Sequence, residues 1–240
     1  MKIDPEKCTS CLECIDFCPM VAIFEGEQVA EIDQDECVEC SVCLKADICP
    51  TDAFYMPEES MRHPRFLRAA FSDVTVKHPS LGIGGRGTEE VKTNDVTGRF
   101  KKGEYGIALE FGRPGIGTRI AEIEKVAKII CPMNVEIEKE NPVYSLFDDL
   151  KTGAMKPEVI HEKILSAIFE FKIKENQLED VINALLPVLK EVNTVVSWGL
   201  ITRFDDDGTL PVRERLQKIR FNVRPNAKIN LGMGRPLIEE

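Results

Sequence analysis

The spacing of the cysteines is the feature that most restricts what this chain can fold into. Eight of the nine cysteines lie between residues 8 and 49 of the 240-residue chain. They form two runs, each with three cysteines separated by two residues and a fourth cysteine that precedes a proline. The runs are Cys8, Cys11, Cys14 and Cys18-Pro19, then Cys37, Cys40, Cys43 and Cys49-Pro50. Thiols this dense indicate a disulfide framework, a redox loop or a metal site.

The two runs are copies of one segment. A shift of 29 residues places five positions of the first copy on the second: Ile3, Asp4, Cys8, Cys11 and Cys14 fall on Ile32, Asp33, Cys37, Cys40 and Cys43. The second run holds two extra residues, so the shift then becomes 31. It carries Cys18-Pro19, Ala22 and Ile23 onto Cys49-Pro50, Ala53 and Phe54. An internal duplication of this kind predicts two equivalent sites.

The spacing favours iron–sulfur clusters over zinc. Three closely spaced cysteines can surround three corners of a cubane cluster, and the proline directs the chain so that the fourth cysteine ligates the other cluster. The predicted ligands of cluster one are Cys8, Cys11, Cys14 and Cys49, and those of cluster two are Cys37, Cys40, Cys43 and Cys18. A zinc site with four thiolates would need neither the third cysteine of each triplet nor the crossed fourth one.

Disulfides are the other alternative, and the rest of the sequence disfavours them. The first residues, "MKIDPEKC", contain no apolar signal-peptide core, and no apolar run approaches the length of a membrane span. We therefore expect a cytoplasmic protein without a membrane span. In that compartment the cysteines would be reduced thiols or metal ligands.

Residues 1–57 resemble a bacterial-type ferredoxin with two [4Fe-4S] clusters, down to the "CPTDAF" at 49–54. The resemblance implies a ferredoxin domain over residues 1–60 and covers about a quarter of the chain. Two features depart from the family. Five residues instead of three separate Cys43 from Cys49, and glycines common in such loops are absent from "CTSCLEC" and "CVECSVC". We expect the lengthened arm, with Lys45, Ala46 and Asp47, to form an excursion beside cluster two.

Residues 1–60 are strongly acidic. They contain 15 Asp or Glu and 3 Lys, a net charge of −12 in a chain whose total is −10. A negative environment disfavours the addition of an electron, so we expect a low reduction potential. It also steers the domain toward a redox partner protein with a basic docking surface, and makes nucleic acid an improbable ligand.

Residues 61–103 form a connector of the opposite charge. Nine Lys or Arg and four Asp or Glu lie between residues 62 and 103. The glycine-rich composition predicts an extended segment with little regular structure. Gly82, Gly84 and Gly87 match a dinucleotide fingerprint, but no strand precedes them and no helix follows, so we interpret them as a turn or connector. We predict that six basic residues partly cover the acidic head: Arg62, Arg65, Arg68, Arg99, Lys101 and Lys102.

Residues 104–204 have the periodicity of a second domain. Alternating apolar residues predict strands in "EYGIALEF", "MNVEIEK", "LSAIFEFKIK" and "TVVSWGLITRF". Apolar stripes predict one helix through Ile120, Ile123, Ala127 and Ile130, and another through Leu178, Ile182, Leu185 and Leu189 that is kinked or interrupted at Pro187. The predicted fold class is therefore α+β: a dicluster ferredoxin domain, then a βαββαβ sandwich of ferredoxin-like topology, then a C-terminal extension over 205–240.

One loop of the second domain is a candidate anion site. In "FGRPGIGTR" a strand passes through glycines into a helix, where backbone amides and arginines can bind a carboxylate or phosphate. The candidate residues are Gly112, Arg113, Gly115, Gly117 and Arg119. An ordinary tight turn with exposed arginines is the alternative. Cys131, far from the two runs, is interpreted as a buried inert thiol.

Three function classes fit these features. The first is a low-potential electron carrier, free or as a subunit, whose second domain docks it to a partner oxidoreductase. The second is a component of an anaerobic reductase whose Gly-Arg loops bind an anionic substrate or cofactor. The third is a redox regulator that senses a ligand. No catalytic residue accompanies the clusters, and four protein ligands per cubane favour relay of electrons over substrate binding at iron. A homo-oligomer is compatible with each class.

Overall fold

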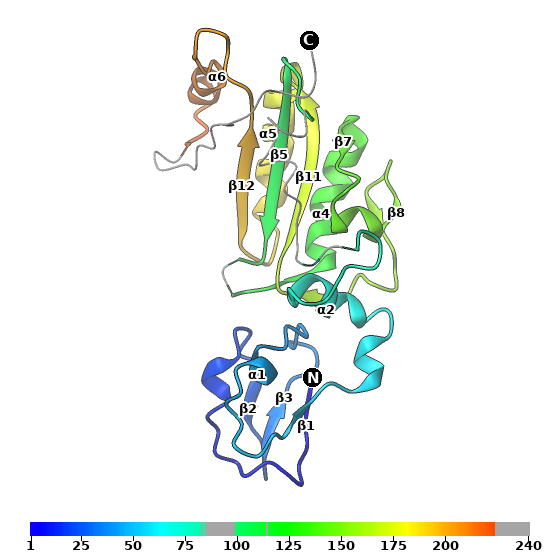
Figure 1. Ribbon diagram of the computed structural model, residues 1–240. Coiled ribbons are helices and arrows are strands. Elements are labelled where there is room, and N and C mark those ends of the chain that lie inside the picture. Colours follow the sequence, from blue (N-terminus) through cyan, green and yellow to red (C-terminus); the bar gives the residue numbers. More distant parts are fainter. Residues whose placement is uncertain (83, 85–98, 114, 224–240) are drawn as a thin grey trace.

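The structure is a computed structural model that describes residues 1–82, 84, 99–113 and 115–223. A small N-terminal unit and a larger C-terminal unit are joined through a helix that lies between them, α2 (Figure 1). The elements of the N-terminal unit and of the segment after it are β1 (Lys2–Ile3), η1 (Ile15–Phe17), β2 (Ile23–Glu25), β3 (Ala30–Ile32), α1 (Val42–Lys45), β4 (Phe54–Tyr55), η2 (Glu58–Met61) and α2 (Phe66–Ser72).

The duplication is visible in how the N-terminal strands pair. β1 pairs antiparallel with β4, and β2 pairs antiparallel with β3. Ile3 lies opposite Phe54, and Ile32 lies opposite Ile23, which are the same two positions of the repeat. The last strand of one copy thus pairs with the first strand of the other. This exchange makes the two copies depend on each other for folding.

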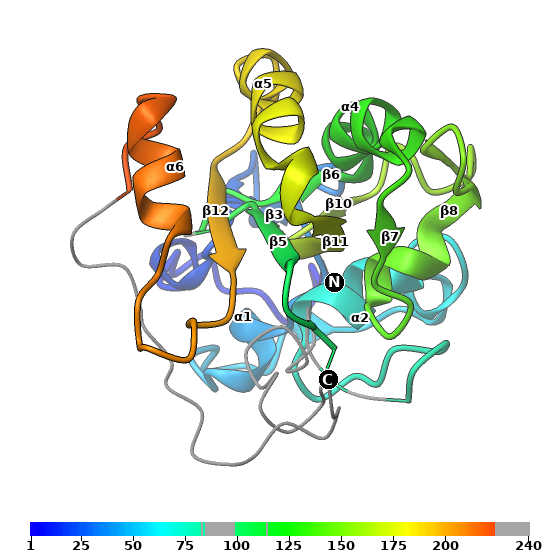
Figure 2. The ribbon, with the colours of Figure 1, turned by 90° about the horizontal axis from the view of Figure 1, so that it is seen from above.

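The C-terminal unit contains a four-stranded antiparallel sheet in the order β12-β5-β11-β7. Helices α4 and α5 cover one face of it (Figure 2). The elements are β5 (Glu104–Phe111), β6 (Thr118–Arg119), α4 (Ile120–Ile130), η4 (Cys131–Met133), β7 (Glu136–Ile137), η5 (Pro142–Leu146), β8 (Phe147–Asp149), β9 (Ala154–Met155), β10 (Lys163–Ile164), β11 (Ala167–Lys174), η6 (Glu175–Gln177), α5 (Leu178–Leu189), β12 (Val196–Ile201) and α6 (Val212–Lys218).

The core between sheet and helices follows the predicted periodicities. Alternate residues of β5 and β11, including Phe111, Phe169 and Phe171, are almost completely buried. The predicted stripe of α4 is buried along its whole length, at Ile120, Ile123, Ala127 and Ile130. The mixed α+β class is therefore confirmed. One detail was wrong, because the strand expected in "MNVEIEK" is reduced to Glu136 and Ile137. Of the two alternatives at Pro187, the interruption is excluded, since α5 continues through Pro187 to Leu189.

The segment expected to be extended contains a regular helix. Residues 66–72 form α2, and six of its seven residues are buried. Leu67 and Phe71 pack into the C-terminal core. The physical reason is local burial. These seven residues lie between two domains and bury apolar side chains there, whereas the prediction averaged them with the glycine-rich, basic rest of the segment. The domain limits proposed from the sequence stay a prediction.

Truncation of Phe169 tests the core. Its side chain is fully buried in β11 between two other aromatic rings, Phe147 and Phe171. We expect Phe169→Ala to lower the free energy of unfolding of the C-terminal unit by about 3–5 kcal/mol. Phe204→Ala is the control, because that ring is 43% exposed and its loss should change stability little. Denaturant unfolding followed by circular dichroism measures both. Equal effects would contradict the assigned core.

Candidate metal centre

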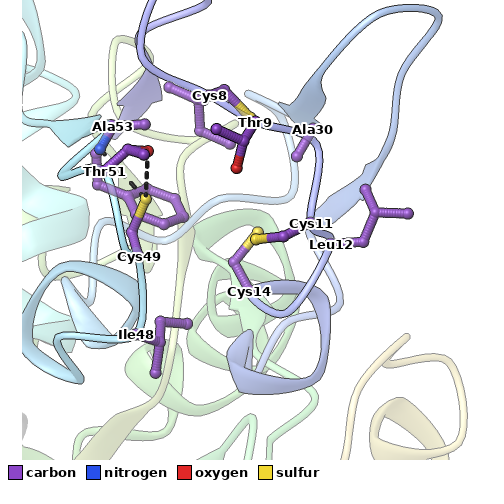
Figure 3. A pocket seen from close by; sticks show the side chains of 12 residues that line it. Cys8, Thr9, Cys11, Leu12, Cys14, Ala30, Ile48, Cys49, Thr51 and Ala53 are labelled. Atoms are coloured by element: carbon purple, nitrogen blue, oxygen red, sulfur yellow. Dashed lines mark hydrogen bonds between the residues drawn. The ribbon is translucent and has the colours of Figure 1, made fainter.

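The first cavity of the N-terminal unit is lined by cysteines from both copies. Cys8, Cys11 and Cys14 come from the first run, and Cys49 comes from the end of the second (Figure 3). The cavity encloses about 340 Å³, including space open to solvent, and its remaining wall is mainly apolar, with Ile3, Ala30, Ile48 and Phe54. The structure therefore brings together the four residues that the spacing grouped as ligands of cluster one. Ligation itself stays a prediction.

The second cavity repeats this arrangement. Cys37, Cys40 and Cys43 line it from the second run, and Cys18 from the end of the first. It encloses about 350 Å³, and its other lining residues include Met20, Ile23, Ile32 and Val38. Each cavity thus has three thiols on one loop and a fourth from the other copy. The proline after each fourth cysteine begins a turn: Val21 N–H donates to Cys18 O, and Asp52 N–H donates to Cys49 O.

The cysteine loops curl because of left-handed residues at equivalent places. Ser10 and Leu12 have positive φ in the first loop, and Glu39 and Ser41 in the second. The same conformation recurs after each Cys-Pro pair, at Val21 and Asp52. None of these residues is glycine, so each conformation costs about 1–2 kcal/mol relative to a glycine. Such strain persists only where the surrounding structure requires it, as at a ligand site.

The fourth cysteine of each set accepts a hydrogen bond at its sulfur. Ala22 N–H donates to Cys18 Sγ over 3.2 Å, and Ala53 N–H donates to Cys49 Sγ over 3.3 Å. These two bonds occupy equivalent positions of the repeat. Amide donors to sulfur stabilise the thiolate and raise the reduction potential of a cluster bound there.

The donor set fits a cluster better than a single ion. Within the described residues, no three Cys, His, Asp or Glu side chains converge closely enough to hold one metal ion. A tetrahedral zinc site would bring its sulfurs to about 2.3 Å from one point. The sulfurs instead surround a cavity, as a cubane requires. The residues present therefore fit an iron–sulfur cluster in each cavity.

Burial makes the free thiols poor acids. Burial, together with the neighbouring Cys40 and Cys37, raises the pKa of Cys43 to about 12. Burial also opposes ionisation of Cys49, but hydrogen bonds from Ala53 and Thr51 outweigh it and lower the pKa of that thiol. Thiolate formation in the second cavity therefore depends on a cation that compensates the charge, so metal binding is coupled to release of protons.

Comparison with known proteins identifies the N-terminal segment. The 4Fe-4S binding domain family matches residues 1–24. A ferredoxin of Methanothermococcus thermolithotrophicus is 42% identical over 59 residues, which are 23% of this chain and 95% of that protein. This chain belongs to the ferredoxin family. The ferredoxin of Rickettsia felis is 40% identical over 84 residues, which are 32% of this chain and 75% of that protein.

A larger protein shares the same ferredoxin segment. The indolepyruvate oxidoreductase subunit IorA of Archaeoglobus fulgidus is 52% identical over 50 residues, which are 20% of this chain and 7% of that subunit. No solved structure matches the chain. In the part of the chain that the structure describes, no helix is both long and apolar enough to span a membrane.

The lengthened arm of the ferredoxin segment binds the chain that follows α2. Lys45, at the end of α1, donates to Asp73 and to Thr75 Oγ1, the latter over 2.8 Å. Asp47 has positive φ, so the arm turns back immediately toward Cys49. The predicted excursion is present, and its role is docking of residues 73–75. Charge-assisted hydrogen bonds outweigh burial and lower the pKa of Asp73.

Three of the six basic residues expected to cover the acidic head contact it, and for Arg62 the contact is local in the chain. Arg65 donates to Glu39 Oε1 and to both the carbonyl and the side chain of Gln34. Arg68 donates to three backbone carbonyls of the ferredoxin segment, those of Gln34, Asp35 and Cys37. Arg62 pairs with Glu58, one turn away.

For the residues near 100 the covering prediction was wrong. Arg99 forms ion pairs with Glu138 and Glu140, and Lys102 lies 3.7 Å from Asp206, all in the C-terminal part. Net charge alone could not show which acidic groups each cation meets. The remaining basic residue, Lys101, donates its backbone N–H to Glu104.

The backbone amides and arginines of the candidate anion loop already have partners within the protein. The N–H groups of Ile116 and Gly117 donate to Gly112 O, Arg113 lies 3.2 Å from Glu110, and Arg119 contacts His161 O and Glu36. Gly115 faces the carbonyl of Pro19, and a Cβ added at Gly117 would meet Met20 Cε at 2.5 Å. The glycines therefore allow close contact with the ferredoxin segment. An anion would have to displace the arginine contacts, so the anion site stays a prediction.

Two further sequence predictions concern isolated residues. Cys131 is buried at the end of α4, and burial raises its pKa to about 11, as expected of an inert thiol. Gly87 of the dinucleotide fingerprint lies outside the described residues.

Sequence reasoning missed the acceptors that the C-terminal part and the ferredoxin segment offer each other. Glu162 receives Arg68, while Glu36 receives both Arg119 and Lys163. Leu165 packs against Met20 and Val38, and its backbone N–H donates to Ser72 Oγ. These residues lie in stretches without a motif, so only the fold could bring them together.

Neutralising Lys45 tests the docking of the arm. Lys45→Met keeps most of the apolar stem and leaves the buried Asp73 without its cation. We expect the protein to lose about 1–2 kcal/mol of stability, because a buried charged acceptor is left with fewer partners. Lys7→Met is the matched control, since Lys7 is exposed and makes no ion pair with any described residue. Denaturant titrations of the three proteins give the comparison, and equal stabilities would refute the docking role.

Proposed function

We propose that this protein transfers electrons by means of two [4Fe-4S] clusters, one in each cysteine-lined cavity. The observation that carries the proposal is the pair of cavities, each with four cysteines at equivalent positions of a duplicated ferredoxin segment. When bound, each cluster takes up and gives back one electron. Amide donors to Cys18 and Cys49 and the apolar walls hold the ligand sulfurs in place and limit access of water.

The proposed ligands of cluster one are Cys8, Cys11, Cys14 and Cys49, and those of cluster two are Cys37, Cys40, Cys43 and Cys18. Four protein ligands per cubane leave no open position at iron. Relay of electrons therefore explains the sites better than binding of a substrate at the metal. The acidic surface of residues 1–60 supports a redox partner with a basic docking surface.

We also assign the C-terminal domain to the βαββαβ class. Its element order is β5, α4, β7, β11, α5, β12, all four strands are antiparallel to their neighbours, and both helices lie on one face. The two outer positions of the sheet are occupied by β7 and β12, while β5 and β11 are central. This domain would hold the ferredoxin segment in a fixed orientation relative to a partner.

A second candidate is a subunit of a larger oxidoreductase. The similarity of residues in the ferredoxin segment to part of the IorA subunit supports it, because there a ferredoxin segment belongs to a redox enzyme. Affinity purification under anaerobic conditions distinguishes the two. A stable, stoichiometric partner with a catalytic cofactor favours the subunit, and a lone chain that reduces several acceptors favours the free carrier.

Iron content tests the two-cluster proposal. We expect anaerobically purified protein to contain about eight irons per chain, and two irons or fewer with stoichiometric zinc would contradict the proposal. Cys49→Ala should remove cluster one although Cys49 belongs to the second run, lowering the content to about four irons, because alanine has no donor atom for iron. Cys131→Ala is the control and should keep the full iron content, because Cys131 lies in the C-terminal core. Retention of cluster one in Cys49→Ala would refute the crossed ligation.

A further inference from the structure

The duplication makes the two cysteine loops an internal comparison, and they differ in exposure. Thr9, Ser10 and Cys11 of the first loop are exposed. Their equivalents in the second loop are Val38, which is 1% exposed, Glu39, which is 0% exposed, and Cys40, which is partly buried. The two loops have equivalent turns but unequal exposure at these three positions.

The cover of the second loop comes from the rest of the chain. Leu165 packs on Met20 and Val38, which both line the second cavity. The glycine loop after β5 lies against Pro19 and Met20 of the same wall. Asp73, held by Lys45, also bonds the side chain of Ser41. The C-terminal domain and the connector thus cover one wall of the second cavity.

Arg68 is the centre of this cover. Its side chain is 5% exposed, and its NH1 donates to Gln34 O at 2.9 Å, Asp35 O at 3.1 Å and Cys37 O at 2.8 Å. Its Nε donates to Glu162 of the C-terminal domain. One buried cation therefore joins the backbone of a cluster-two ligand to the second domain. Its charge lies beside cluster two and is partly balanced by Glu162.

The carboxylates differ in the same way as the loops. Around the second loop, Glu36 pairs with Arg119 and Lys163, and Glu39 pairs with Arg65. Around the first loop, Glu6, Glu13 and Glu27 are exposed and form no ion pair with any described residue. Glu27 precedes Gln28, whose carbonyl accepts a hydrogen bond from Ser10. Among the described residues, cations of this chain pair with two carboxylates beside the second loop, whereas three carboxylates beside the first loop are open to a cation of another protein.

We propose that the two clusters have different roles. Cluster one is the port where electrons pass to and from a redox protein with a basic docking surface. Cluster two is an inner cluster whose reduction potential is set by Arg68. The inference rests on the proposed two-cluster function. Electron tunnelling falls steeply with distance through protein, so the exposed loop around Cys11 gives an external partner the shorter path. Cluster two then exchanges electrons with solution through cluster one.

The charges around Arg68 predict opposite shifts in reduction potential when Arg68 and its partner Glu162 are neutralised in turn. A buried cation stabilises an added electron nearby, because screening by water is weak. Arg68→Gln removes the cation and leaves Glu162 unpaired, so the reduction potential of cluster two should fall. Glu162→Gln leaves the guanidinium uncompensated, so that potential should rise. A purely structural role, in which either change opens the interface, would shift the potential in one direction for both variants.

Anaerobic potentiometry, with the cysteine proton signals in NMR spectra identifying each cluster, measures these shifts in the full-length protein. Cluster one should keep its potential in both variants. Arg62→Gln is the control, because Arg62 is on the surface and pairs only with Glu58 among the described residues. Shifts of the same sign in both variants, or an equal shift of cluster one, would overturn the role of Arg68.

Hexaamminechromium(III) tests the port. This inert paramagnetic cation cannot bind thiolates and mimics a basic docking group. It should broaden the proton signals of Cys8, Cys11 and Cys14 more than those of Cys37, Cys40 and Cys43. Equal broadening, or stronger broadening at cluster two, would overturn the port. Iron analysis of the same sample separates the two ideas: fewer than about eight irons refutes the two-cluster proposal, whereas a full complement with equal broadening refutes only the port.

Discussion

Four thiols must surround each cavity, and the chain meets this requirement by exchange between two copies of one segment. Cys18 leaves the first copy to line the second cavity, and Cys49 leaves the second copy to line the first. The strands are exchanged in the same sense, since β1 pairs with β4 and β3 with β2. Neither copy can therefore complete its site or its strand pair alone. With only small apolar clusters inside this unit, metal binding would supply much of its stability.

The second constraint is charge. An acidic segment that also holds anionic clusters needs compensating cations, and among the described residues the buried ones lie beside the second loop. Arg65, Arg68 and Lys163 all contact the side of the second loop. Because these pairs are partly or fully buried, salt screens them much less than exposed pairs. The ferredoxin segment is thereby held on the C-terminal domain, while the first loop keeps its exposed carboxylates.

Local patterns predicted the parts of this structure that depend on local chemistry. The cysteine spacing grouped the same residues that line each cavity, and alternation located β5, β11 and β12, together with the buried face of β5 and β11. The helix α2 was missed because its seven residues lie in a segment whose overall composition is basic and rich in glycine. The partners of Arg68 and Arg99 could not be predicted either, since an arginine carries no local sign of which carboxylate the fold will bring to it.

The departure from family spacing shows how the symmetry of the duplication was broken. The two extra residues between Cys43 and Cys49 extend the chain after α1, and Lys45 in this arm reaches Asp73 and Thr75. In the first copy, the shorter arm between Cys14 and Cys18 makes no equivalent contact in the described part of the chain. The loop Cys8–Cys14 likewise forms no hydrogen bond or ion pair with a described residue beyond 60. The insertion and the C-terminal residues that pack on the ferredoxin segment both lie beside the second cavity. A local change in spacing thus supplies one of the contacts that make two copies of one site unequal.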